Sequence, residues 1–169
     1  MNLCRAIGVL IILLLVLLLQ HIIHEYAHVL IAKVVGVRTI RIQWFTYSKI
    51  VLGTKVFFEN EPTFNEENLG KKWGWISIAG LMSTLPIGYI FTIIYLIYSK
   101  YMDNWLMLVV WLFSVVFLIC DPLYFFIGSV LSLGDVVGFR KVFNIKKSVS
   151  IIVCLLVLLI NWLIIKSFW

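Results

Sequence analysis

Charged residues are scarce in this chain of 169 residues, since only 13% are Asp, Glu, Lys or Arg while 63% are hydrophobic. An ordinary soluble domain is roughly a quarter charged, so the composition excludes a water-soluble globule. The high hydrophobicity also excludes a disordered chain. Only three cysteines are present, and an odd number lying in apolar stretches excludes a disulfide framework. The net charge of +6 does not indicate a nucleic-acid partner, because the basic residues cluster between apolar stretches, as they do beside membrane spans.

Apolar stretches long enough to cross a bilayer, about 20 residues, dominate the chain. They cover residues 3–35, 75–98, 105–131 and 149–168. We expect Gly36 to end the first helix and Pro122 to break the third. The predicted fold is an all-α polytopic membrane protein with four transmembrane helices. It forms one integral membrane domain, residues 1–169, in which the first three spans form the core and the fourth is accessory.

The loop between the first two spans has its own pattern. Residues 37–44 alternate apolar and polar side chains, and residues 50–58 are rich in branched and aromatic ones. This pattern predicts a small β-hairpin lying against the membrane surface.

The basic residues predict the orientation in the membrane. Four spans place both termini on one side, which carries three Lys and Arg residues, whereas the other side, with the loops of residues 36–73 and 134–148, carries 11. The positive-inside rule therefore predicts a multi-pass protein of the cell membrane with cytoplasmic loops and both termini outside. The end of the first span then faces the cytoplasm.

The main chemical signal is an H-E-x-x-H sequence, His24 to His28, late in the first span. On a helix, residues four apart share a face, so His24 and His28 can bind one zinc ion while Glu25 acts as general base. The alternative is that these residues only mark an interfacial helix end. Ionisable residues at membrane depth are costly and usually functional, which favours a metal site.

A catalytic zinc needs a third protein ligand, and two aspartates are candidates. Asp121 and Asp135 both lie late in the sequence of the third span or just after it, at the depth of the histidines. Asp121 precedes Pro122 and could instead have a capping role, whereas glycines near Asp135 allow a tight turn. His21 is about 10 Å along the helix axis from His28. It is too distant to share the ion easily, so it is a candidate for supporting the site, for binding substrate, or for a purely interfacial role.

These motifs resemble the site-two protease family of intramembrane zinc metalloproteases. The H-E-x-x-H at a span end and the strand-rich loop after it match that family. Ala79 to Thr84 is similar to its A-G-P-x-x-N element, with Leu81 and Thr84 in place of proline and asparagine. Asp121-Pro122 and then Gly134-Asp135 stand where the family has N-x-x-P and a ligand aspartate beside glycine. The resemblance covers residues 15–140 and implies Asp135 as third ligand, with Asp121 or Thr84 orienting water or substrate. Gly80, Thr84 and Gly88 also form a small-residue stripe that allows close helix packing.

The sequence therefore predicts an enzyme, a zinc metalloendopeptidase with one Zn²⁺, that cleaves a membrane protein or peptide in or near a transmembrane segment. One alternative is a non-catalytic metal-binding or pseudoprotease protein that binds transmembrane helices. Another is a zinc enzyme acting on a lipid or a small molecule. A free edge of the predicted hairpin favours a peptide substrate, because it can pair with an extended main chain.

Overall fold

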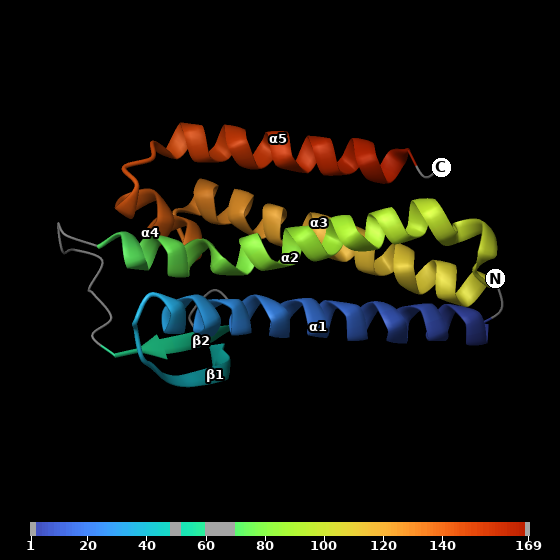
Figure 1. The fold of residues 1–169 in the computed structure, drawn as a ribbon, viewed down its shortest axis with the longest axis horizontal. Helices are drawn as coiled ribbons and strands as arrows, with labels where there is room; N and C mark the ends of the chain where they lie inside the picture. Colours follow the sequence, from blue (N-terminus) through green and yellow to red (C-terminus); the bar gives the residue numbers. More distant parts are fainter. Residues whose placement is uncertain (1–2, 48–51, 60–69, 168–169) are drawn as a thin grey trace.

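The computed structural model describes residues 3–47, 52–59 and 70–167, which form helices and one hairpin. In chain order these are α1 (Leu3–Val34), β1 (Thr39–Tyr47), β2 (Leu52–Phe58), α2 (Lys71–Tyr98), a 3₁₀ turn (Ser99–Tyr101), α3 (Asn104–Leu131), α4 (Asp135–Val142) and α5 (Lys147–Lys166). Figure 1 shows the long helices side by side, with the hairpin and α4 at one end of the bundle. The beginning of α1 and the end of α5 lie at the opposite end.

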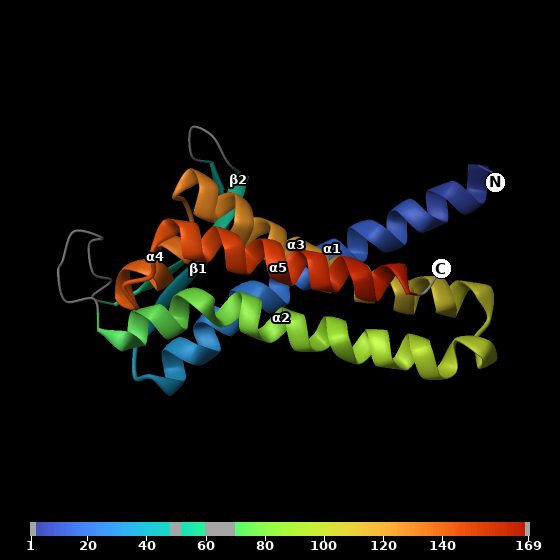
Figure 2. The same cartoon turned by 90° about the horizontal axis from the view of Figure 1, so that it is seen from above.

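Four of the helices, α1, α2, α3 and α5, are long and apolar enough to cross a membrane. Their outer faces are apolar as well: Leu10, Leu14 and Leu18 of α1 are each more than half exposed. Figure 2 shows the N-terminal half of α1 diverging from the other helices, which explains this exposure. The predicted spans coincide with these helices, although α2 begins at Lys71, before the predicted residue 75. Residue 168, the predicted end of the last span, lies outside the described residues.

Gly36 ends α1 as the sequence predicts. Its φ is +76°, a left-handed conformation that costs glycine little. The N–H of Val37 donates to the carbonyl of Ala32 at 2.7 Å, and the N–H of Gly36 to that of Lys33 at 3.2 Å. These two bonds form a Schellman motif, which satisfies carbonyls at the end of the helix.

The prediction that Pro122 breaks the third helix is wrong, because α3 continues through it. Proline lacks the N–H that would bond to the carbonyl four residues earlier, which is that of Leu118. In this protein the Nδ2 group of Asn161, on α5, donates to the Leu118 carbonyl at 2.6 Å. Tyr89 on α2 donates to Oδ1 of the same Asn161 at 2.8 Å. A neighbouring helix thus satisfies the carbonyl that proline leaves free, which is how such prolines are tolerated in membrane helices.

The predicted hairpin is present as two antiparallel strands, with β1 paired to β2. It packs against the C-terminal half of α1. The Thr54 hydroxyl lies 2.6 Å from Nε2 of His21, and the Trp44 ring lies 6.0 Å from the Tyr26 ring, centroid to centroid. These contacts attach the hairpin to the helix that carries the H-E-x-x-H sequence.

The short helix α4 was not predicted, because the sequence there reads as a loop. Two left-handed residues precede it, Ser132 at φ 57° and Gly134 at φ 68°. The N–H of Leu133 donates to the Gly128 carbonyl at 2.9 Å and closes the end of α3. The chain then reverses, and α4 packs against α2 and α3. This turn places Asp135, the first residue of α4, beside α1.

Candidate metal centre

The two histidines of the H-E-x-x-H sequence lie on one face of α1 and point into the bundle. His24 and His28 are 5% and 6% exposed, and their ring centroids are 4.9 Å apart. Gln20, one turn earlier on the same face, is also buried. The four-residue spacing therefore produces the shared face that the sequence predicts.

Each histidine uses its Nδ1 atom to bond to an acceptor. Nδ1 of His28 lies 2.6 Å from the carbonyl oxygen of Ile76, and Nδ1 of His24 lies 2.9 Å from Oδ2 of Asp121. A carbonyl oxygen only accepts, so Nδ1 of His28 is the donor. A carboxylate also only accepts, so Nδ1 of His24 donates to Asp121. In a neutral imidazole the Nε2 atom then carries the free lone pair, which is the form that binds a metal.

Asp135 lies opposite both Nε2 atoms. Its Oδ2 is 3.3 Å from Nε2 of His24 and 3.4 Å from Nε2 of His28. When the two histidines are protonated, their hydrogen bonds and positive charges outweigh the effect of burial and hold the pKa of the Asp135 carboxyl well below its usual range. One ligand atom from each of the three residues lies within 4.8 Å of the others. Two imidazole lone pairs and a carboxylate converge on one point, and this donor set fits a divalent cation such as zinc.

Asp121 lies on the other side of the His24 ring and is part of a buried polar network. It accepts hydrogen bonds from Nδ1 of His24, from the Thr84 hydroxyl, and from Nε2 of Gln20 at 2.7 Å. Its three partners come from α1 and α2, while Asp121 itself is on α3. The two candidate aspartates therefore differ in position. Asp135 faces the Nε2 atoms of both histidines, whereas Asp121 accepts a hydrogen bond from Nδ1 on the opposite side of the His24 ring.

Gln20 was not singled out from the sequence, although its position offered a signal. It precedes His24 by four residues, so it shares the face of the two histidines. A polar residue at this position of an apolar helix needs a partner, and Asp121 is that partner.

Gly80 provides the space for the His24 ring. A Cβ atom at this position would overlap with the imidazole. Thr84, one turn later, is fully buried and donates to Asp121. The Ala79 to Thr84 element therefore combines close packing at Gly80 with a polar contact from Thr84.

Glu25 and His21 differ in their surroundings. Glu25 is 8% exposed and lies between the two histidines in α1. His21 is partly buried and contacts Thr54 of the hairpin rather than Asp135 or Asp121. It is thus not among the residues that converge with His24 and His28.

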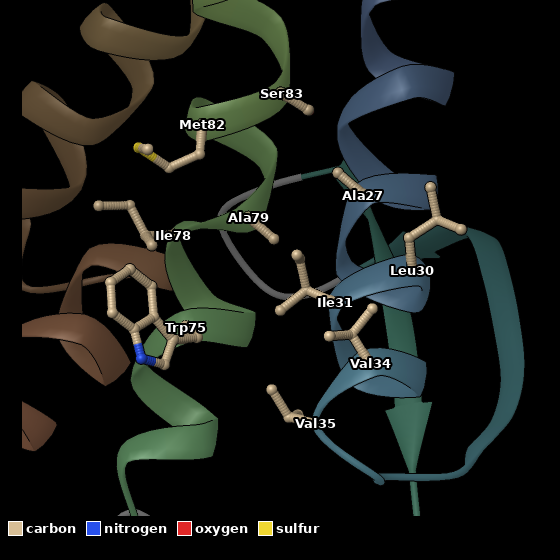
Figure 3. Close-up of a pocket in the computed structure, with 10 residues that line it drawn as sticks. All are labelled: Ala27, Leu30, Ile31, Val34, Val35, Trp75, Ile78, Ala79, Met82 and Ser83. Atoms are coloured by element: carbon tan, nitrogen blue, oxygen red, sulfur yellow. The ribbon is translucent and has the colours of Figure 1, made fainter.

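An apolar cavity of about 460 Å³ lies between α1 and α2. Figure 3 shows it lined on one side by α1 residues such as Ala27 and Ile31, and on the other by α2 residues such as Ala79 and Met82. Ala27 adjoins His28 in the chain, and Ala79 adjoins Gly80. The cavity is therefore lined by neighbours in sequence of residues of the candidate metal centre.

Comparison with protein-family models, curated proteins and solved structures finds no match to this chain.

Proposed function

We propose that this protein is an intramembrane zinc metalloprotease that hydrolyses a peptide bond in or near a transmembrane segment of its substrate. The observation that carries the proposal is the convergence of His24, His28 and Asp135 beside Glu25. Two histidines, one carboxylate and a neighbouring glutamate are the parts of a hydrolytic zinc site.

His24, His28 and Asp135 would hold the ion. A zinc ion bound there supplies Lewis acidity, which polarises a carbonyl group and makes water more acidic. Asp121 and the Ile76 carbonyl keep the two imidazole rings in the orientation and tautomer that this requires.

Glu25 is the general base in this proposal. Its carboxylate accepts a proton from the attacking water and then passes it to the leaving amine nitrogen. A new C–O bond forms, the C–N bond breaks, and the proton ends on the amine. Burial keeps the carboxylate of Glu25 away from bulk water, which strengthens its electrostatic effect.

A peptide substrate is favoured by two surfaces beside the centre. Among the described residues, β1 and β2 pair only with each other, so their outer edges can pair with an extended main chain. The cavity between α1 and α2 is apolar and suits the side chains of a membrane segment. Both surfaces adjoin α1, so a substrate bound to them lies next to Glu25.

We further propose that α1, α2, α3 and α5 cross the cell membrane with the centre near its cytoplasmic face. Figure 1 shows the hairpin and α4, whose first residue is Asp135, at the end of the bundle where α1 ends. The loops at that end carry most of the basic residues, which favours the cytoplasmic side.

Glu25→Gln tests the mechanism. The purified protein, reconstituted with a panel of synthetic transmembrane peptides, should contain one zinc ion and cleave at least one peptide. Glu25→Gln should keep the zinc and lose cleavage, because an amide cannot take the proton and Glu25 is not a ligand. His28→Ala should lose both.

The outcomes separate the alternatives. Unchanged turnover in Glu25→Gln would remove the mechanism. A wild-type protein that binds zinc, binds the peptides and cleaves none of them would indicate the non-catalytic helix-binding protein. Release of a fatty acid from the reconstituted lipid without peptide cleavage would indicate a zinc enzyme of lipids.

A further inference from the structure

Tyr124 reaches the candidate metal centre from α3, although no motif includes it. It follows Asp121 by three residues and so lies on the same face of that helix. Its ring meets the His24 ring edge-on, with centroids 5.9 Å apart. Its hydroxyl lies against Gly134, the residue before Asp135. The phenol group is therefore close to the carboxylate that faces both histidines.

The backbone at Gly134 is shaped to admit this hydroxyl. A Cβ atom at residue 134 would overlap with the Tyr124 oxygen. The φ of +68° at Gly134 also disfavours any residue with a side chain. Residue 134 therefore favours glycine for two reasons, its positive φ and the close approach of the Tyr124 hydroxyl.

Among the described residues of the centre, the more exposed ones lie on the side of Tyr124. His24, Glu25 and His28 are at most 8% exposed. In contrast, the side chain of Asp135 is 30% exposed, and Tyr124 is 43% exposed. A ligand that approaches the histidines from this side comes close to the Tyr124 side chain.

The hydroxyl also keeps a proton to donate. Within residues 3–47, 52–59 and 70–167, no side chain accepts a hydrogen bond from the phenolic O–H. A hydroxyl that packing holds against Gly134, and that is free to donate, is a preorganised donor.

We propose that Tyr124 is a catalytic residue whose hydroxyl donates to the carbonyl oxygen of the scissile peptide bond as that oxygen becomes negatively charged. The inference rests on the proposed function and deepens it. Tyr124 keeps its proton throughout, while the proton from water passes through Glu25 to the leaving amine. The tyrosine stabilises charge that exists only in the transition state, so its effect falls on kcat.

Tyr124→Phe tests this role, because it removes the hydroxyl and keeps the ring. We expect kcat to fall about 100-fold, which is typical for the loss of one such donor. KM and zinc content should stay as in the wild type. Tyr89→Phe is the matched control, since it removes a hydroxyl that bonds to Asn161 on α5 and not to a residue of the centre. It should leave kcat unchanged.

A binding measurement gives a second readout that needs no turnover. The probe is N-phosphoryl-Leu-Trp, whose tetrahedral phosphoryl group imitates the charged transition state. Titration of the zinc-loaded, detergent-solubilised protein should give about 100-fold weaker binding for Tyr124→Phe than for the wild type. The Tyr89→Phe control should bind as the wild type does.

The results distinguish a failure of this inference from a failure of the proposed function. A wild-type protein that holds zinc but neither cleaves peptides nor binds the probe would overturn the proposed function. A wild type that cleaves and a Tyr124→Phe variant with equal kcat would overturn the role of Tyr124 alone. Loss of zinc in Tyr124→Phe would show that the hydroxyl only positions Asp135, which also contradicts the inference.

Discussion

Side chains of the same residue type make different contacts in the candidate metal centre. Asp121 and Asp135 are both aspartates near the same pair of histidines. One accepts a bond at Nδ1 of His24, and the other faces Nε2 of both rings. The first orients a ring, and the second is placed to bind the ion.

Asp135→Ala and Asp121→Ala should therefore differ in their effect on zinc affinity. Asp135→Ala should abolish stoichiometric zinc binding, as His28→Ala does, because each removes a ligand. Asp121→Ala should weaken zinc binding by about 10- to 100-fold, the usual effect of losing the residue that orients a histidine. Competition with a chelator measures both affinities. Stronger zinc loss in Asp121→Ala than in Asp135→Ala would reverse the assignment.

The sequence predicts part of this arrangement. The shared face of His24 and His28 follows from helix geometry, since their spacing is local. The choice between Asp121 and Asp135 is not local, because it depends on the left-handed turn at Ser132 and Gly134. The resemblance to a known family favoured Asp135, whereas the spacing of the residues left both open. Tyr124 and Gln20 were missed because each acts through a contact between helices.

At the scale of helices, side-chain hydrogen bonds between spans hold the bundle together. The bond from Asn161 to the Leu118 carbonyl is the clearest case, since Pro122 leaves that carbonyl without its helical donor. Thr92 of α2 and Ser114 of α3 form a second buried pair at 2.5 Å. These contacts attach α5 and α2 to α3.

A double-mutant cycle at Asn161 and Pro122 tests this account. Asn161→Leu should lower the free energy of unfolding in detergent by about 1 kcal/mol, because it leaves a buried carbonyl unpaired. In the Pro122→Ala background the same change should cost less, since alanine has the backbone N–H that proline lacks and can donate it to the Leu118 carbonyl. Leu159→Ile, a change on an exposed position of α5, is the control and should have little effect. Equal costs in both backgrounds would contradict the account.

Some helices and strands can be predicted from the sequence, and others cannot. The long helices and the hairpin were predicted because their hydrophobic patterns extend over many residues. The eight residues of α4 have no such pattern, and packing against α2 and α3 stabilises this helix. The break expected at Pro122 did not occur because a residue 39 positions later in the sequence, Asn161, supplies the missing donor.

For the whole molecule, the distribution of charge sets the expected orientation. The loops of residues 36–73 and 134–148, together with Lys33 at the end of the first span, hold 11 of the 14 basic residues. The positive-inside rule therefore predicts that these loops are cytoplasmic and that both ends of the chain are outside.

Labelling of introduced cysteines tests the orientation. Replacing Cys4, Cys120 and Cys154 by alanine gives a background without thiols. In intact cells, a membrane-impermeant maleimide should then label a cysteine added after Trp169 and should not label Ser148→Cys. After permeabilisation both positions should react. The reverse pattern in intact cells would overturn the topology.

The left-handed turn before α4 has a consequence for the synthesis of the protein. His24 is made early, and Asp135 follows 111 residues later. At a translation rate of roughly 5–20 residues per second, this interval lasts on the order of 10 s. During that time α1 is already made, yet the ion has no third ligand. Under the proposed function, the nascent chain therefore stays inactive until α4 folds back, which protects the insertion machinery and the chain itself from premature cleavage.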